Sequence, residues 1–333
     1  MSKRLLLSRI LEKFYLRHIM APFTSPSFIV VNYHRIYSTP SVETEFDSDV
    51  FGHSAKSFEQ HVSWLSKNCN VLSESDLISA MKDGFPVGKP NVLITFDDGY
   101  IDNFEIAVPI LQKYGVSATF FVPYLSIENR EVGWWDLAAW CLKKTEKTSL
   151  TIAGESLLLD SRASTYLATR AVHGIFKKKK HEETGGLIKQ LSIATGVALP
   201  DETVQSQELM SWSQLRQMIE LGMSIGSHTM SHRVLSRIEN KDQDWEIIES
   251  KSKISERLGT DVRSIAYPVG KRDSINAYSL EASEKAGYDL AFSFYSGFYK
   301  GDMPNRFDIK RVCLSEEDPL YISEMVAPKI FLP

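Results

Sequence analysis

The strongest pattern in this chain is NVLITFDDGY at residues 91–100, where apolar and β-branched residues lead directly into two carboxylates and a glycine. Adjacent side chains of a regular strand point to opposite faces, so a strand that continued through both carboxylates would separate them. A strand that ends at Phe96, followed by a turn that Gly99 permits, could direct Asp97 and Asp98 to one point. Two anions held that close repel each other unless a positive charge lies between them. The segment therefore predicts a buried strand with a cation site at its end.

Short apolar runs alternate with longer amphipathic segments on both sides of this strand. Besides 91–96, strands are predicted at 28–33, 117–122, 222–227, 263–267, 288–293 and 307–313. Helices are predicted at 57–67, 73–83, 103–114, 242–258 and 276–286, and Gly115, Gly259 and Gly287 stand where helices should end. This alternation predicts a mostly parallel sheet. About seven strands favour a barrel over an open sheet, although periodicity alone does not choose between the two.

One segment, from about 130 to 206, interrupts the alternation between two predicted strands. It contains Trp134-Trp135-Asp136, a leucine-rich stretch at 157–159 and four lysines from Lys177 to Lys180, and we expect it to be helical. Insertions at the active face of such folds often form lids or substrate walls. The lysine run is most simply a solvated helix face, with contact to an anionic carrier or lipid as the alternative.

Composition sets limits on the class of protein. The 333 residues can bury a substantial core, either as one large α/β domain or as a core with a smaller addition. A formal net charge of -4 leaves no basic surplus to neutralise phosphates, so we expect no nucleic-acid partner. The three cysteines at positions 69, 141 and 313 are too widely spaced for a disulfide framework or a zinc-thiolate cluster.

Candidate partners for the carboxylates stand in GSHTMSH at residues 226–232. His228 and His232 are four residues apart, which places them on one face of a helical turn, directly after an apolar run from Met223 to Ile225. A histidine pair alone is more often structural than metal-binding. A carboxylate pair at another strand end favours metal binding instead. Two neutral imidazoles and one carboxylate leave a metal position open for water, which is the pattern of catalytic zinc.

Three motifs of this chain resemble those of one protein family. TFDDGY at 95–100, SHTMSH at 227–232 and IAYPVG at 265–270 resemble motifs of the polysaccharide deacetylase family. This family is also described as the NodB-homology family and as carbohydrate esterase family 4-like. The likeness covers roughly residues 28–315, is closest to the exopolysaccharide-type branch, and is weakest in the insertion. It implies a distorted (β/α)7 barrel with a helical insertion. It also implies one divalent metal, with Zn²⁺ as the first choice and Co²⁺, Ni²⁺ or Mn²⁺ as alternatives, and the removal of acetyl groups from sugars.

The resemblance also assigns roles to residues of this chain. Asp98, His228 and His232 would hold the ion, which lowers the pKa of its water towards ~7. Asp97 would act as the general base that takes the proton of this water. A backbone N–H of the 267–270 loop, assigned to Val269, would stabilise the oxyanion together with the metal. An ordinary strand-to-helix turn is the alternative for that loop.

The general acid is where the chain departs from the family pattern. Many members carry a late histidine in a leucine-containing motif, whereas this chain has no histidine after His232. His34 follows the first predicted strand, which in a parallel barrel places it on the same face as the other motifs. The exopolysaccharide-type branch has a similar Tyr-His near its start and no late histidine. We therefore expect His34 to be functional, with a structural histidine as the alternative.

Further candidates come from the last strand and from aromatic residues. Arg311 could reach the same face, where its guanidinium would keep Asp97 ionised. Arg263 is the competitor for that position, and a purely structural salt bridge is an equal alternative for either arginine. Candidate sugar-stacking residues, for each of which core packing is the alternative, are Tyr100, Trp135 and Tyr267.

Residues 1–22 are expected to form a separate amphipathic helix, ahead of a catalytic domain over 23–333. Leu6, Leu7, Ile10, Leu11 and Phe14 repeat at helical spacing opposite Arg9 and Lys13. The longest apolar run is three residues, shorter than a signal-peptide core or a membrane span. The helix would dock on its own domain or lie on an anionic membrane surface. The expectation is a cytoplasmic protein, with peripheral contact to the inner membrane surface as the alternative.

The combined prediction is a metal-dependent hydrolase that removes acetyl groups, in the first place N-acetyl groups, from an amino-sugar-containing polysaccharide or its biosynthetic precursor. Its partner would be an acetylated amino-sugar glycan or a lipid-linked precursor. Two alternatives stay open: hydrolysis of another non-peptide C–N bond, in an amide or a cyclic imide, on the same fold, and carbohydrate binding without turnover.

Overall fold

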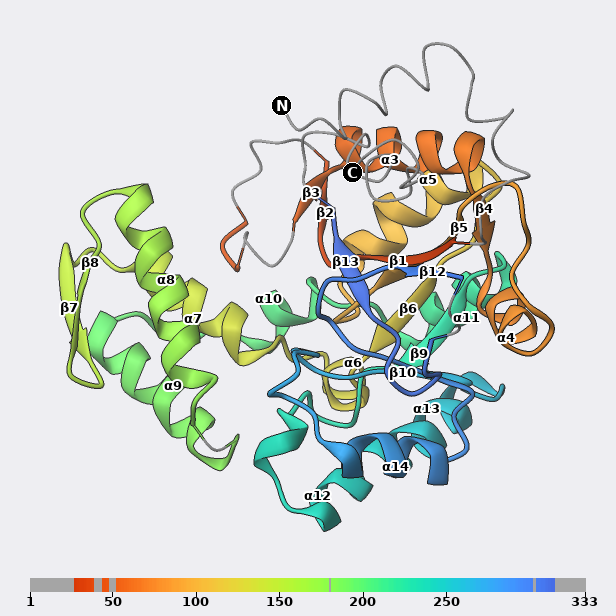
Figure 1. Cartoon of the computed structure of the whole chain (residues 1–333). Coiled ribbons are helices and arrows are strands. Elements are labelled where there is room, and N and C mark those ends of the chain that lie inside the picture. Colours follow the sequence, from red (N-terminus) through yellow and green to blue (C-terminus); the bar gives the residue numbers. More distant parts are fainter. Residues whose placement is uncertain (1–26, 39–43, 48–51, 180, 302–303, 315–333) are drawn as a thin grey trace, which may run out of the picture.

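The computed structural model in Figure 1 describes residues 27–38, 44–47, 52–179, 181–301 and 304–314. The helix predicted over residues 1–22 lies outside this range. Within it, no helix has both the length and the apolar character that crossing a bilayer requires.

A curled, mostly parallel sheet forms the centre of the molecule. Its strands are β1 (Ser27–Tyr33), β4 (Asn70–Leu72), β5 (Asn91–Phe96), β6 (Thr119–Val122), β9 (Ser224–Ser227), β10 (Ser264–Ala266), β11 (Leu290–Phe292), β12 (Tyr299–Lys300) and β13 (Arg311–Cys313). The order is β11-β10-β9-β6-β5-β1, with β12 antiparallel and β13 parallel to β1, and β4 beside β5. All seven predicted strands are present, whereas the short β4 and β12 were not predicted.

The sheet curls until its two ends are joined by one chain segment. Ile309 forms a parallel bridge to Phe292 of β11, and Arg311 pairs in register with Val30 of β1. Residues 309–313 therefore connect the two sides of the sheet. This arrangement confirms the predicted distorted barrel.

Both faces of the sheet are buried, which explains why β5 is a continuous apolar run. Along β1, Ile29 and Val31 belong to the apolar cluster under the outer helices, and Phe28 and Val30 belong to a second cluster that includes Phe121 and Phe292. Alternate residues of one strand thus supply the outer layer and the barrel interior.

Helices cover the outer face of the barrel (Figure 1). They are α3 (Ala55–Asn68), α5 (Val108–Lys113), α6 (Tyr124–Asn129), α11 (Trp212–Glu220), α12 (Asn240–Asp244), α13 (Ser250–Leu258) and α14 (Ala277–Lys285), with a 3-10 turn η3 (Leu235–Arg237). Helix α4 (Glu74–Asp83) instead contributes Leu77 and Ile78 to the interior cluster. The helices predicted at 103–114 and 242–258 each contain a π-helical turn, η2 (Asn103–Ala107) and η4 (Trp245–Glu249). A short parallel pair, β2 (Ile36–Tyr37) and β3 (His53–Ser54), follows β1. Two-residue strands of this kind carry no periodicity that a sequence pattern can detect.

The insertion between β6 and β9 stands beside the barrel and has its own apolar core (Figure 1). It consists of α7 (Trp134–Lys144), β7 (Ser149–Ile152), β8 (Glu155–Leu158), α8 (Arg162–Phe176), α9 (His181–Thr195) and α10 (Glu202–Ser206). The β7–β8 hairpin departs from the purely helical expectation. Its two-residue turn has positive φ at Ala153 (51°) and Gly154 (82°), the type I′ geometry that suits a tight hairpin.

Candidate metal centre

The two adjacent aspartates leave β5 in different directions because the backbone turns left-handed after Asp97. The φ angle is 75° at Asp98 and 77° at Gly99. A Cβ atom on Gly99 would lie 2.7 Å from the Cδ1 atom of Ile127, so this turn needs glycine for its conformation and for its close packing. The turn directs the Asp98 carboxylate away from that of Asp97.

Backbone strain is concentrated around this point. Among the six non-glycine residues with positive φ in the described ranges, four belong to the recognised motifs: Asp98, Thr229, His232 and Val269. Each such conformation costs on the order of 1–3 kcal/mol and persists only where the surrounding structure imposes it. Strain of this kind is typical of functional sites.

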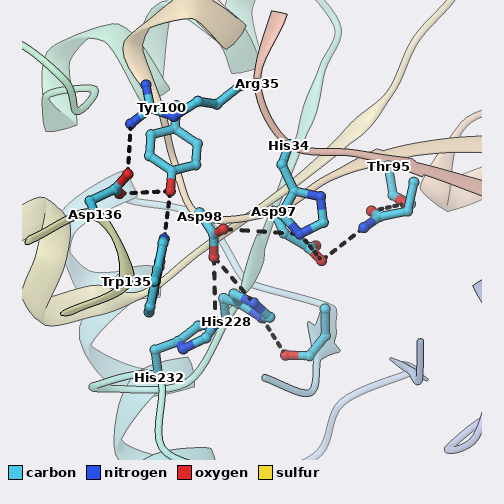
Figure 2. Close-up of polar contacts among 12 residues, drawn as sticks. His34, Arg35, Thr95, Asp97, Asp98, Tyr100, Trp135, Asp136, His228 and His232 are labelled. Carbon is cyan, nitrogen blue, oxygen red and sulfur yellow. Dashed lines mark hydrogen bonds and ion pairs between the residues drawn. The ribbon is translucent and has the colours of Figure 1, made fainter. Parts of the chain in front are cut away.

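The side chains of Asp98, His228 and His232 converge on one point (Figure 2). Their candidate ligand atoms lie within 4.8 Å of one another. The Oδ1 atom of Asp98 lies 3.6 Å from Nε2 of His228 and 3.5 Å from Nε2 of His232, distances too long for hydrogen bonds. Within the described part of the chain this buried oxygen has no hydrogen-bond partner, which is costly unless a cation occupies the space. The donor set therefore fits a divalent metal ion.

Hydrogen bonding and burial keep both candidate ligands, His228 and His232, neutral. The Nδ1–H of His228 donates to the carbonyl oxygen of Ala266 at 2.7 Å, which leaves the Nε2 lone pair facing Asp98. The ring of His232 lies against that of Trp135, with centroids 4.4 Å apart. Burial holds the pKa of His228 below its ordinary value and that of His232 well below it.

The π-helical turn η4 holds the loop that carries His232. Its Glu246 accepts hydrogen bonds from the backbone N–H of Met230 through its main-chain oxygen (3.1 Å) and from that of Ser231 through its carboxylate (2.8 Å). The hydroxyl of Ser231 also donates to this carboxylate. A π turn shifts the side chain that follows it, and such turns are frequent at functional sites.

Asp97 is held in a different environment from Asp98. Arg311 donates to both of its oxygens, at 2.7 and 2.8 Å, and the side-chain amide of Asn32 donates at 2.9 Å. Burial raises the pKa of Asp97, but the Arg311 guanidinium and His228 outweigh it and hold this pKa below its ordinary value. The contact expected between Arg311 and Asp97 is thus present, whereas Arg263 pairs with Asp289 at 2.8 Å and does not line the cavity.

In contrast, burial and then the neighbouring Asp97 raise the pKa of Asp98 well above its ordinary value. A cation beside Asp98 would reverse this effect, because it favours the charged form of the carboxyl.

His34 lies beside both aspartates, immediately after β1. Its Nε2 atom is 3.8 Å from Asp97 Oδ2 and 4.0 Å from Asp98 Oδ2. Its main-chain oxygen accepts a hydrogen bond of 2.7 Å from Asn103, the first residue of the π turn η2. Burial lowers the pKa of His34 to about 3, so the ring is neutral at neutral pH.

A cavity of about 340 Å³ opens over these residues. The insertion supplies one wall of it through Trp134, Trp135, Arg170, His173 and Lys177. The barrel supplies the other through residues that include His34, Asp97, Val269, Lys271 and Phe294. The insertion therefore shapes the space next to the predicted metal position.

The predicted substrate contacts divide into two groups. Trp135 and Val269 line the cavity. Tyr100 is only 1% exposed, its ring is covered by the Arg35 guanidinium 3.7 Å away, and its hydroxyl donates to Asp136. Tyr267 touches the cavity but is fully buried, and its hydroxyl donates to the main-chain oxygen of Phe307. These contacts favour core packing over sugar stacking for both tyrosines.

Sequence reasoning missed several residues around the site. They include Asn32, Arg35, Trp134, Asp136 and His173. Arg35 reaches Asp136 at 3.3 Å across 101 residues of sequence, a separation at which no local pattern reports contact. Asn32 could have been identified from the sequence, because a side-chain amide at the end of an apolar strand is buried and needs a hydrogen-bond partner.

Comparisons with known proteins point to one family. The family model described as polysaccharide deacetylase matches residues 85–141 and 162–291, more than half of the chain. YxkH of Bacillus subtilis, whose assigned name is that of a polysaccharide deacetylase, is 25% identical over 243 residues. That match covers 73% of this chain and 58% of the relative, so the chain spans less than two thirds of the length of this relative.

Two solved structures share the fold. The deacetylase PplD of Streptococcus pyogenes, in complex with acetate, has a TM-score of 0.61 and 18% identity, and the match covers 92% of this chain and 100% of that one. A de-N-acetylase from Aggregatibacter actinomycetemcomitans has a TM-score of 0.54 and 16% identity, over 88% of this chain and 96% of that one.

Proposed function

Because this chain belongs to the polysaccharide deacetylase family, we propose that it removes acetyl groups, in the first place N-acetyl groups, from an amino-sugar-containing polysaccharide or its biosynthetic precursor. The observation that carries the proposal is the convergence of Asp98, His228 and His232 beside an ionised Asp97 at the floor of one cavity. A structural neighbour that is a de-N-acetylase, and another that was solved with acetate, favour an acetyl group as the target.

Asp98, His228 and His232 would hold one divalent cation, with Zn²⁺ the first choice for two imidazoles and a carboxylate, and Co²⁺, Ni²⁺ or Mn²⁺ as alternatives. When bound, the ion supplies Lewis acidity, which polarises the acetyl carbonyl and lowers the pKa of a water.

Asp97 is the general base in this proposal. Both of its oxygens accept hydrogen bonds from Arg311, and one also accepts from Asn32, so the carboxylate is oriented and is not available as a tight metal ligand. Its lowered pKa keeps it ionised, as a group that accepts a proton from the attacking water must be. Arg311 acts through Asp97 and is therefore a positioning residue.

His34 carries the proton onward to the leaving nitrogen. A neutral His34 cannot begin as the acid, but its Nε2 atom lies 3.8 Å from the Asp97 carboxylate that has just gained a proton. The proton passes from water to Asp97, then through His34 to the amine nitrogen as the C–N bond breaks. Acetic acid and a free amino sugar result, the acid ionises to acetate in solution, and both side chains return to their starting charge. The backbone N–H of Val269, on the cavity wall, faces the developing oxyanion in this scheme.

The test is acetate release from N-acetylglucosamine oligomers, measured on Zn²⁺-loaded enzyme before and after treatment with a chelator. We expect release that stops when the metal is removed and returns when Zn²⁺ is restored. Release that is indifferent to metal content would contradict the metal scheme. If the oligomers bind but neither they nor a panel of amides and cyclic imides are hydrolysed, the chain is a carbohydrate-binding protein instead.

A further inference from the structure

Three cationic side chains, Arg170, Lys177 and Lys271, line the cavity and have no role in the proposed hydrolysis. We infer that they form a binding site for an anionic group, a phosphate or a carboxylate, on or directly beside the acetylated sugar. This inference rests on the proposed function and specifies the class of substrate.

The cations come from both walls of the cavity. Arg170, His173 and Lys177 have i, i+3, i+7 spacing at the end of α8, so they share one face of the helix, and all three line the cavity. Lys271 follows Gly270 in the loop after β10, close in sequence to Val269. The insertion and the barrel therefore each bring positive charge to the same space.

These three cations differ from the buried arginines nearby. Arg35 pairs with Glu208 at 2.7 Å, and Arg311 pairs with Asp97. Among the residues that the structure describes, Arg170, Lys177 and Lys271 form no ion pair. All three side chains are exposed to solvent where they line the cavity. Partial desolvation, and then repulsion by Arg170 and Lys271, lowers the pKa of Lys177. An anion between them would relieve that repulsion.

The carboxylates of the cavity do not offset this charge. They are Asp47, Asp97 and Asp98. Arg311 neutralises Asp97, and Asp98 is assigned to the metal ion. Asp47 lies 3.6 Å from His173 and remains the single acid against three cations. A cavity wall with this surplus attracts and retains anions.

Chemistry and size narrow the ligand further. Arginine and lysine together are the usual partners of phosphate and carboxylate oxygens. A volume of about 340 Å³ is at the small end for ligand sites, so the anionic group must belong to the acetylated sugar or to the unit linked to it.

The test compares three N-acetylglucosamine disaccharides: a neutral one, one with a phosphate at the reducing end, and one with an adjacent uronic acid. The wild-type enzyme should have a lower KM for at least one anionic substrate than for the neutral one. The substrate with the lowest KM identifies the preferred anion. In Lys177→Gln, Arg170→Gln and Lys271→Gln, the KM for that substrate should rise about tenfold more than the KM for the neutral disaccharide. Lys178→Gln is the matched control, because this neighbouring lysine does not line the cavity.

Equal KM values for the three substrates would overturn the inference while leaving the deacetylase proposal intact. The same holds if Lys177→Gln and Lys178→Gln change the KM for the anionic substrate equally. If no disaccharide releases acetate, the proposed function fails and calorimetry decides the inference separately. Because nothing is hydrolysed in that case, the wild-type protein can be used, and it should bind N-acetylglucosamine 1-phosphate about tenfold more tightly than N-acetylglucosamine, a difference that Lys177→Gln should abolish. Equal affinities would contradict the anion site.

Discussion

Two identical neighbouring residues, Asp97 and Asp98, have opposite electrostatic environments. Arg311 and Asn32 satisfy the first carboxylate, whereas the second faces two imidazoles and has an unsatisfied buried oxygen. The left-handed backbone at residue 98 creates this difference. The proposed general base and the proposed metal ligand can therefore lie next to each other in sequence without competing for the same ion.

The ion pair between Arg311 and Asp97 should matter for stability and for the pH dependence of activity. Arg311→Met leaves a buried carboxylate without its partner, which typically lowers the free energy of unfolding by about 3–5 kcal/mol. It also removes the charge that depresses the pKa of Asp97, so this pKa rises and the acid limb of kcat/KM moves to higher pH. Urea denaturation and a pH–rate profile measure the two effects.

Arg263→Met is the control for that change. Its pair with Asp289 is partly exposed, so its loss should cost about 0–1 kcal/mol and leave the pH profile in place. Equal effects of the two substitutions would show that Arg311 does not tune Asp97.

At the scale of elements, strand ends and helix starts hold the site loops in place. The π turn η2 anchors the main chain at His34, and η4 anchors the loop of His232. Both turns lie inside helices that the sequence pattern predicts as regular. The extra residue of a π turn changes hydrogen bonding without changing the apolar periodicity enough to be recognised.

Helix α4 packs on the barrel through a buried acid whose titration should affect stability. Glu74 accepts a hydrogen bond from Ser264 of β10, and burial raises its pKa from 4.5 to about 7. Between these pH values the folded state holds a proton that the unfolded state has lost, so stability falls as pH rises and levels off above about 7. Glu74→Gln should therefore stabilise the protein by roughly 2–3 kcal/mol at pH 8 and have little effect at pH 4. Urea midpoints at the two pH values test this, and a pH-independent effect would contradict it.

Strand β9 delivers His228 and depends on a glycine for its fit. A Cβ atom on Gly226 would lie 2.4 Å from the ring of Phe121, so Gly226→Ala must displace β9 or that ring. We expect a loss of about 1–3 kcal/mol of stability together with weaker metal binding, measured by urea denaturation and zinc titration.

Gly174→Ala in α8 is the matched control, because its Cβ atom meets nothing within 4 Å and alanine favours a helix. It should leave stability unchanged or slightly raised. Full zinc affinity in Gly226→Ala would refute the link between this packing and the ligand.

On the scale of the whole molecule, the sequence predicts the barrel better than the insertion. The seven buried strands and the aspartate and histidine motifs follow from patterns within single segments. The roles of Tyr100 and Tyr267 do not, because burial of their rings depends on residues far away in sequence. Lys177 is exposed, as the predicted solvated helix face requires. The packing of the insertion against the barrel also places it on the cavity wall, which no local sequence pattern indicates.

Metal binding should stabilise the whole chain, since the three candidate ligands come from the ends of two strands, β5 and β9. A cation at one hundred times its Kd adds about 2.7 kcal/mol to the folded state. Zn²⁺ should therefore raise the Tm of the wild-type protein by a few degrees and leave the Tm of His228→Gln unchanged. The same rise in both proteins would place the stabilising ion elsewhere.

The most direct test of the account is acetate release by Asp97→Asn enzyme whose bound metal is quantified in the same sample. The three candidate ligand residues stay intact in this variant, whereas the proton acceptor and the charged partner of Arg311 are lost. We predict that metal content equals that of the wild-type protein while kcat falls by about 10²–10⁴-fold. Undiminished acetate release at full metal occupancy would show that Asp97 is not the base and would contradict the proposed division of roles between the two aspartates.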